Sequence, residues 1–186
     1  MTSVSIAGWR IGEGSPCYVI AEVGSNHDGK LEQALELLDA AANAQADAVK
    51  FQSFVADEIA SPREEKLYRF FATPGRATPM TWWGALKRRA DHHGIHLLST
   101  PFDCGTATQL RAAGVPAFKI SSGDLTYHTL IEHVGRLGRP TILSTGMATM
   151  EEVAAACDVY YNTGNRSLIL LQCVSNYPAK IGRAHV

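Results

Sequence analysis

The sequence lacks an excess of charge of either sign, and it lacks long apolar runs. Seventeen Lys and Arg residues against eighteen Asp and Glu residues leave a net charge of −1, whereas a nucleic-acid-binding domain normally carries a basic excess. No apolar run approaches the roughly 20 residues that cross a bilayer. Residues 1–14 contain no apolar segment typical of a secretory signal. We therefore expect a cytoplasmic protein that binds neither nucleic acid nor membrane.

The sequence also lacks closely spaced cysteines. Cys17, Cys104, Cys157 and Cys173 lie far apart, and no two form a C-x-x-C pair. Cys17 and Cys173 lie in or beside apolar runs, where a free thiol behaves as a small hydrophobic group. We expect free thiols in or near the core of a protein from a reducing compartment, with a catalytic thiol as the alternative.

What the chain does contain is an alternation of short apolar runs with helical patterns. The runs predict strands at Tyr18–Val23, Ala48–Phe51, His96–Ser99, Ala117–Ile120, Thr141–Ser144 and Leu168–Cys173. Helices are expected at Leu31–Asn43, Trp82–His93, Thr106–Ala113, Leu130–Leu137 and Glu151–Tyr161. Apolar strands that alternate with helices indicate a parallel α/β sheet. The sheet is either an open, doubly wound one or most of a (β/α)8 barrel, which needs about 250 residues.

One long connection, from Ser53 to about Thr81, interrupts this alternation. It contains three prolines and an aromatic, basic segment, Lys66–Phe71. Long connections in compact domains are often functional, so a lid or subunit contact is one interpretation. The other is a surface excursion with a single helical turn.

Polar side chains follow each predicted strand at its carboxyl end. Such ends meet on one face of a parallel α/β fold, where ligands bind, so we expect one polar site on an apolar body. Lys50 and Lys119, with hydroxyl groups and glycine-rich turns, suit a phosphate or carboxylate. Glu22 and Asp124 are candidates for proton transfer or for holding a cation. The lysines could instead only compensate these carboxylates, or one lysine could form a Schiff base.

The histidines do not form a zinc pattern. His27 lies in the loop that follows the first strand, where a histidine more often supports the loop by hydrogen bonds than binds metal. His92, His93 and His96 are expected at the opposite face, in a surface role. The loop Gly24–Gly29 lacks the G-x-G-x-x-G spacing of a dinucleotide site.

Six segments in order resemble the sialic acid synthases. They are VIAEVGSNHDG (19–29), ADAVKF (46–51), LSTPFD (98–103), FKISSGD (118–124), ILSTGM (142–147) and LLQCVSNYP (170–178). The resemblance implies an α/β fold, an incomplete TIM (β/α)8 barrel with about six parallel strands and five helices. It also implies a catalytic domain over residues 1–180 that condenses phosphoenolpyruvate with an N-acetylmannosamine-like amino sugar to give a nonulosonic acid.

The resemblance also implies residue roles. The positions that hold phosphoenolpyruvate correspond to Lys50, Lys119, Ser122, Ser144 and Ser175. The catalytic positions correspond to Glu22, Asp124 and Tyr177. The family uses a divalent metal, Mn2+ or Mg2+, and the full-length protein is expected to be a homodimer.

Several features depart from the family. Its metal-binding histidines lie beyond Tyr177 and have no counterpart, so we expect no metal ligand in this chain, and we expect it to be inactive alone. Gln172 stands where the family commonly has histidine. Residues 181–186 (IGRAHV) do not resemble the family and are expected to be an artefactual, non-homologous tail. Two alternatives remain: a Schiff-base aldolase that uses Lys50 or Lys119, and a non-catalytic phosphate- or carboxylate-binding module.

Overall fold

The computed structural model describes residues 3–176, so Tyr177 and the expected tail 181–186 lie outside the described residues. Six strands form one parallel sheet whose strand order follows the sequence. They are β3 (Ile20–Gly24), β4 (Ala48–Ser53), β5 (His96–Pro101), β6 (Phe118–Ile120), β7 (Thr141–Ser144) and β8 (Leu168–Leu171). A doubly wound sheet would reverse its strand order part-way. The fold is therefore an incomplete TIM barrel, and the doubly wound alternative is wrong.

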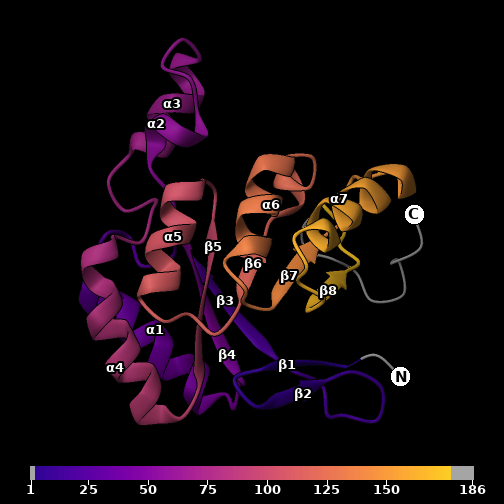
Figure 1. Ribbon diagram of the computed structural model, residues 1–186. Coiled ribbons are helices and arrows are strands. Elements are labelled where there is room, and N and C mark those ends of the chain that lie inside the picture. Colours follow the sequence, from indigo (N-terminus) through magenta and orange to yellow (C-terminus); the bar gives the residue numbers. More distant parts are fainter. Residues whose placement is uncertain (1–2, 177–186) are drawn as a thin grey trace.

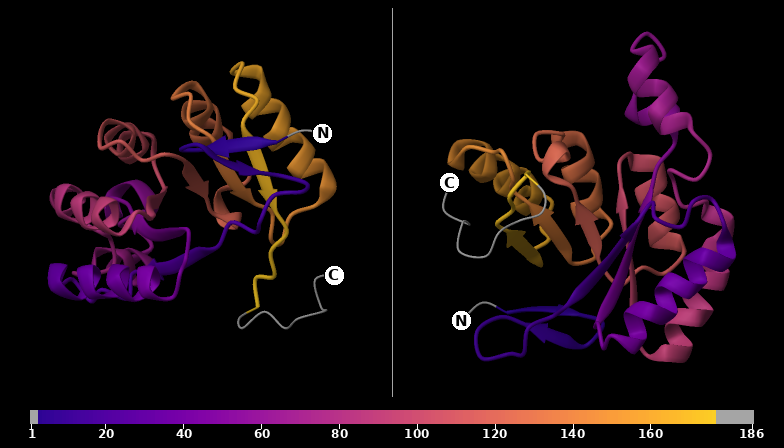
Figure 2. Two further views of the ribbon diagram at one scale, coloured as in Figure 1. Left: turned by 90° about the horizontal axis from the view of Figure 1, so that it is seen from below. Right: turned by 180° about the vertical axis from the view of Figure 1, so that it is seen from behind.

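Five helices connect these strands and cover the outer side of the curved sheet (Figures 1 and 2). They are α1 (Leu31–Asn43), α4 (Trp83–His93), α5 (Cys104–Ala112), α6 (His128–Arg136) and α7 (Met150–Asn162). Each lies within two residues of the predicted bounds. Asp103 begins α5 by accepting a hydrogen bond from the Thr106 amide at 2.6 Å, and Thr149 forms a capping box with Glu152 at the start of α7.

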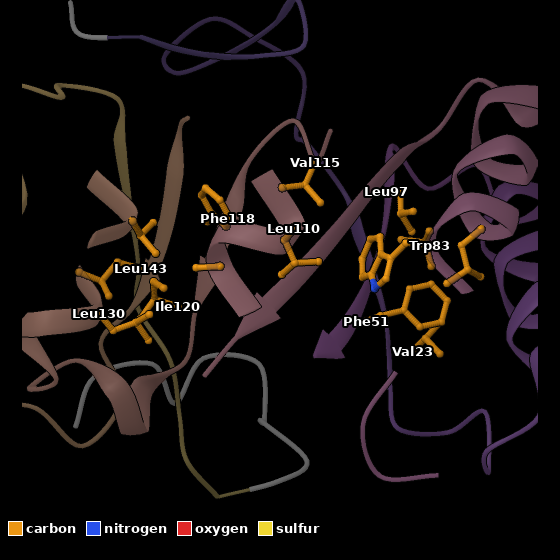
Figure 3. Packing of buried hydrophobic residues seen from close by; sticks show 14 of the residues in the cluster. Val23, Phe51, Trp83, Leu97, Leu110, Val115, Phe118, Ile120, Leu130 and Leu143 are labelled. Atoms are coloured by element: carbon orange, nitrogen blue, oxygen red, sulfur yellow. The ribbon is translucent and has the colours of Figure 1, made fainter. Parts of the chain in front are cut away.

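Alternate residues of each strand pack into two separate cores. The outer core lies between the sheet and the helices and includes Val23, Phe51, Phe118 and Leu143 (Figure 3). The inner core is smaller and contains the residues that face the barrel axis: Ile6, Ala48, Leu98, Ala117 and Ile142. This alternation has a period of two residues. The next inward-facing residues of β4, β6 and β7 therefore lie two positions beyond Ala48, Ala117 and Ile142, nearer the carboxyl ends of the strands.

A short antiparallel hairpin lies below the sheet, at the amino ends of the strands (Figure 1). It consists of β1 (Val4–Ile6) and β2 (Trp9–Ile11), joined by a two-residue turn at Ala7 and Gly8. Ile6 is fully buried in the inner core. The hairpin was not predicted from the sequence, because three-residue strands are too short to show a clear alternation.

The long connection after β4 contains two short helices and a 3₁₀ turn: α2 (Ala56–Ile59), α3 (Glu65–Ala72) and η1 (Met80–Trp82). The helices α2 and α3 project beyond the rest of the fold (Figure 1). Phe54 anchors them by packing edge-on against Phe71 and Phe102. The connection is therefore an ordered extension with more helix than the single turn considered above. A role as a lid or contact surface remains a prediction.

All four cysteines are free. Cys104, Cys157 and Cys173 are half-buried, but Cys17 is exposed, so the expectation of a near-core position is wrong for Cys17. It precedes β3 in the segment that joins the hairpin to the barrel, where the chain has not yet entered the sheet. Within residues 3–176, no helix has the length and apolar character needed to cross a bilayer.

Candidate functional site

A cavity of about 420 Å³ lies at the carboxyl ends of the strands. Its wall contains six of the predicted site residues: Glu22, Lys50, Lys119, Ser122, Ser144 and Ser175. They come from five strands or from the turns that follow them. The structure therefore brings together side chains that lie up to 153 positions apart in the sequence, as expected for the ligand-binding face of a (β/α) barrel. Their individual roles remain predictions.

Lys50 occupies the centre of a small hydrogen-bonded group on the inner face of β4. Its Nζ lies 2.6 Å from Oε2 of Glu22 and donates to Oγ1 of Thr100 at 3.1 Å. The Lys50 side chain is 8% exposed, whereas that of Glu22 is 52% exposed. A buried ammonium needs such partners because burial of an unpaired charge is costly. The pairing fixes the direction in which Lys50 presents its charge to the cavity.

Lys119 is the second ammonium of the cavity and lies on the inner face of β6. Burial and the nearby positive charge of Lys50 lower the pKa of Lys119 to about 8. Cys173, Glu22 and Asp124 oppose this shift. The Nζ donates to the carbonyl of Ile120 at 2.9 Å, and no ion pair of residues 3–176 includes Lys119. An anion in the cavity would supply the missing counter-charge.

The turns after β6 and β7 meet closely beside these lysines. The backbone N–H of Gly146 donates to Oγ of Ser122 at 3.0 Å. A Cβ at position 146 would lie 2.7 Å from Oγ of Ser175 and 2.9 Å from Oγ of Ser122. Only glycine therefore lets the two serine hydroxyls approach this turn. Together with the lysines they form a set of donors suited to an oxyanion.

Asp124 lies near the cavity, but it does not line it. Its Oδ2 accepts a hydrogen bond from Oγ of Ser121 at 2.5 Å within the 3₁₀ turn η2 (Ser122–Asp124). Burial raises the pKa of Asp124, while the Ser121 hydrogen bond and the charge of Lys119 oppose the shift. Tyr177, the third predicted catalytic residue, lies outside the described residues.

Five further residues line the cavity: Gln52, Thr100, Ser121, Gly123 and Cys173. The strand-end pattern contains Gln52, Thr100 and Ser121, but it does not show which of two adjacent polar residues faces inward. Ser99 precedes Thr100 on β5 and points the other way, where it donates to Oγ of Ser53 at 3.0 Å. The alternation of the strand, counted from buried Leu98, would have made this distinction.

His27 supports the loop after β3, as predicted. It is fully buried, and its Nδ1 lies 3.2 Å from the backbone N–H of Gly29, from which it accepts. Its Nε2 therefore carries the proton and donates to Oγ1 of Thr78 at 3.0 Å. These bonds attach the β3–α1 loop to the end of the long connection.

No group of three or more His, Cys, Asp or Glu side chains within residues 3–176 is placed to hold a metal ion. The one carboxylate among the described residues of the cavity wall, Glu22, is paired with Lys50. These residues alone do not fit a divalent cation, which favours several oxygen or nitrogen ligands.

Comparisons with known proteins agree on one family. The model of the NeuB family matches residues 37–186. An uncharacterized protein of Methanocaldococcus jannaschii is 40% identical over 96% of this chain and 52% of its own length. The N,N'-diacetyllegionaminic acid synthase of Legionella pneumophila is 38% identical over 90% of this chain and 51% of its own length.

The same similarity extends to solved structures. The N-acetylneuraminic acid (sialic acid) synthetase of Leptospira borgpetersenii, determined in complex with citrate, is 33% identical and has a TM-score of 0.88. The match covers 97% of this chain and 62% of that one. The chain spans about half the length of the curated relatives it matches.

Proposed function

The chain belongs to the NeuB family, and from that premise we propose that the whole protein condenses phosphoenolpyruvate with an N-acetylmannosamine-like sugar to give a nonulosonic acid. The observation that carries the proposal is the cavity in which Lys50 and Lys119 face the hydroxyls of Ser122, Ser144 and Ser175. Phosphoenolpyruvate carries a phosphate and a carboxylate, so two ammonium groups in one cavity match its charge. The relatives of the chain include an N,N'-diacetyllegionaminic acid synthase and pseudaminic acid synthases.

In the proposed reaction, C3 of the enol attacks the aldehyde carbon of the open-chain sugar, whose oxygen takes a proton. Water then adds to C2 and loses one proton, which balances the proton taken by the aldehyde oxygen. The C2–O bond to phosphate breaks, inorganic phosphate leaves with the bonding electrons, and the new C2 hydroxyl becomes the carbonyl of the product as its proton passes to the phosphate. Lys50 and Lys119 would hold the phosphate and carboxylate and stabilise the charge that develops as this bond breaks. The serine hydroxyls would orient the substrate by donating to its oxygen atoms.

The two carboxylates would have separate roles. Glu22 would orient Lys50 through their 2.6 Å contact and, because it is half-exposed, would face the sugar. Asp124, whose pKa is raised by burial, would handle a proton or the attacking water. The resemblance also implies a divalent metal. The described residues do not form its site, so no step is assigned through it.

The test uses binding, because it requires only the residues of this cavity. We expect phosphoenolpyruvate to bind the 186-residue chain saturably in isothermal titration calorimetry. Substitution of either lysine of the cavity, K50M or K119M, should weaken binding about tenfold or more, since each removes a charge-assisted contact. The control is K66M, which removes the charge of an exposed lysine in α3. Equal affinity of all four proteins would contradict the proposal.

A Schiff-base aldolase is a second candidate, which the lowered pKa of Lys119 favours. An amine with a pKa of about 8 is partly neutral near pH 7.5 and can attack a keto acid. Borohydride reduction in the presence of pyruvate separates the two functions. A covalent adduct on Lys119 would favour the aldolase, and its absence would favour the condensation. Phosphoenolpyruvate binding by the full-length protein without turnover, even with added Mn2+, would favour a non-catalytic anion-binding module.

A further inference from the structure

A second polar cavity, of about 300 Å³, lies at the amino ends of the strands, on the opposite face from the candidate active site. Its wall contains the start of β5, the loops before β6 and β7, part of α4 and the turn of the β1–β2 hairpin. Residues from these elements include Ala7, Lys87, Asp91, His96 and Arg139. None of them takes part in the function proposed above.

Arg139 is the unusual member of this wall. Its Nε is one of three buried side-chain polar atoms of residues 3–176 that have no hydrogen-bond partner. None of the ion pairs formed by these residues includes Arg139. A buried donor without an acceptor is costly, and more so when it is charged. The guanidinium therefore lacks both an acceptor for Nε and a counter-charge.

The remaining charged groups leave this positive charge uncompensated. Lys87 donates to both carboxylate oxygens of Asp91, at 2.5 and 2.6 Å, so these two charges balance. An ammonium has three N–H donors, so one N–H of Lys87 remains free of Asp91. His96 shares a hydrogen bond of 2.7 Å with the Tyr18 hydroxyl, and burial lowers its pKa and favours the neutral imidazole. The wall thus carries one net positive charge.

We propose that this cavity binds a small oxyanion, a carboxylate or a phosphate, whose oxygens accept from the guanidinium of Arg139, a lining residue with no ion-pair partner among residues 3–176. A guanidinium recognises such groups through its planar set of donors. The free N–H of Lys87 provides a second donor on the same wall. A volume of about 300 Å³ accommodates a phosphate or a short carboxylic acid. The inference does not depend on the reaction proposed for the other face.

The experiment is a titration of the 15N-labelled chain with inorganic phosphate, followed by the amide signals of two sets of residues. Ile95 and Gly114 line this cavity, and Ser122 and Gly123 line the candidate active site. We expect saturable shifts at Ile95 and Gly114. In R139Q, the phosphate affinity measured from the shifts at Ile95 and Gly114 should fall about tenfold or more. The shifts at Ser122 and Gly123 should be unchanged.

Two variants serve as controls. R136Q removes the same charge three residues away, from an exposed arginine that pairs with Glu132 instead, and it should keep both responses. K119M should lose the response at Ser122 and Gly123 but keep that at Ile95 and Gly114, so the two sites are tested separately.

Three outcomes would overturn the proposal. The first is the absence of a saturable shift at Ile95 and Gly114, which is expected if only water fills the cavity. The second is an unchanged phosphate affinity in R139Q, and the third is a loss of affinity in R136Q equal to that in R139Q. If R139Q fails to fold, R139K replaces it, because it keeps the charge but lacks the planar set of donors of a guanidinium. Phosphate binding to R139K with unchanged affinity would then exclude the proposed contact.

Discussion

The ammonium of Lys50 lies 2.6 Å from the carboxylate of Glu22, and the two partners differ in exposure, with 8% for Lys50 and 52% for Glu22. An incoming anion must therefore compete with Glu22 for Lys50. The substitution E22Q removes this competition, so we expect the chain to bind sulfate about threefold more tightly, in line with the small energy of a half-exposed ion pair. The amide signals of Ser122 and Gly123 measure the affinity. E32Q, in the first turn of α1, is the control, and weaker sulfate binding by E22Q would contradict this account.

The lowered pKa of Lys119 predicts that anion binding depends on pH. Below its pKa of about 8, Lys119 is protonated and attracts an anion, whereas above it the charge is lost. The affinity for sulfate, whose own charge is constant over this range, should fall about tenfold between pH 6.5 and pH 9.5. K119R should bind with little pH dependence, because arginine stays protonated. A wild-type affinity that does not change with pH would show that Lys119 does not contact the anion.

The six strands and five covering helices could be predicted because each buries an apolar face. Burial of that face fixes the spacing at which apolar residues recur in the sequence. Thr141–Ser144 and Leu31–Asn43 match the observed elements at both ends. The hairpin β1–β2 could not be predicted in the same way. Its one fully buried residue, Ile6, packs against residues more than 40 positions away, such as Ala48 and Leu98, so no local pattern identifies it.

Part of the site was predictable, because the carboxyl ends of parallel strands converge on one face of the fold. Lys50 and Lys119 face one cavity because both lie on the inner face of their strands. The position of Asp124 was not predictable, since it depends on a turn in which the carboxylate accepts from Ser121, three residues earlier. The lack of a hydrogen-bond partner for Nε of Arg139 could not be predicted from the sequence either, because it depends on the folded chain.

Gly146 should tolerate no side chain without a loss of anion binding. In G146A the new Cβ would lie 2.7 Å from Oγ of Ser175 and 2.9 Å from Oγ of Ser122. Because both hydroxyls would have to move, we expect sulfate affinity to fall about tenfold, the value of one charge-assisted hydrogen bond. G123A is the matched control, since its nearest neighbour, Oγ of Ser121, would be 3.7 Å away. An equal effect of the two substitutions would exclude a role for the Gly146 contact.

The turn of the β1–β2 hairpin contains a strained alanine. Ala7 has a φ of +48° and is followed by Gly8 at +91°, as in a type I′ turn, for which Asn-Gly is the preferred pair. A7N should therefore stabilise the chain by about 0.5–1 kcal/mol, measured as a higher midpoint of urea unfolding at an unchanged slope. A44N is the control, because Ala44 has an ordinary φ of −76°. An unchanged or lower midpoint in A7N would show that the turn is not strained.

His27 should make stability depend on pH below about 6.5. Burial lowers its pKa in the folded state, and the charge of Asp28 only partly opposes this shift. Below the ordinary histidine pKa of about 6.5 the unfolded chain therefore binds a proton that folded His27 does not.

The free energy of unfolding should consequently fall as the pH is lowered from 6.5, by at most about 1.4 kcal/mol per pH unit from this group. H27Q should be less stable at pH 7.5, since it loses the bonds to Thr78 and Gly29, and its stability should vary less between pH 6.5 and 5. H92Q replaces an exposed histidine and should keep the wild-type slope. Urea unfolding at a series of pH values measures all three proteins. If H27Q and the wild type lose stability in parallel, His27 is not the group that titrates, and the lowered pKa of His96 becomes the next explanation.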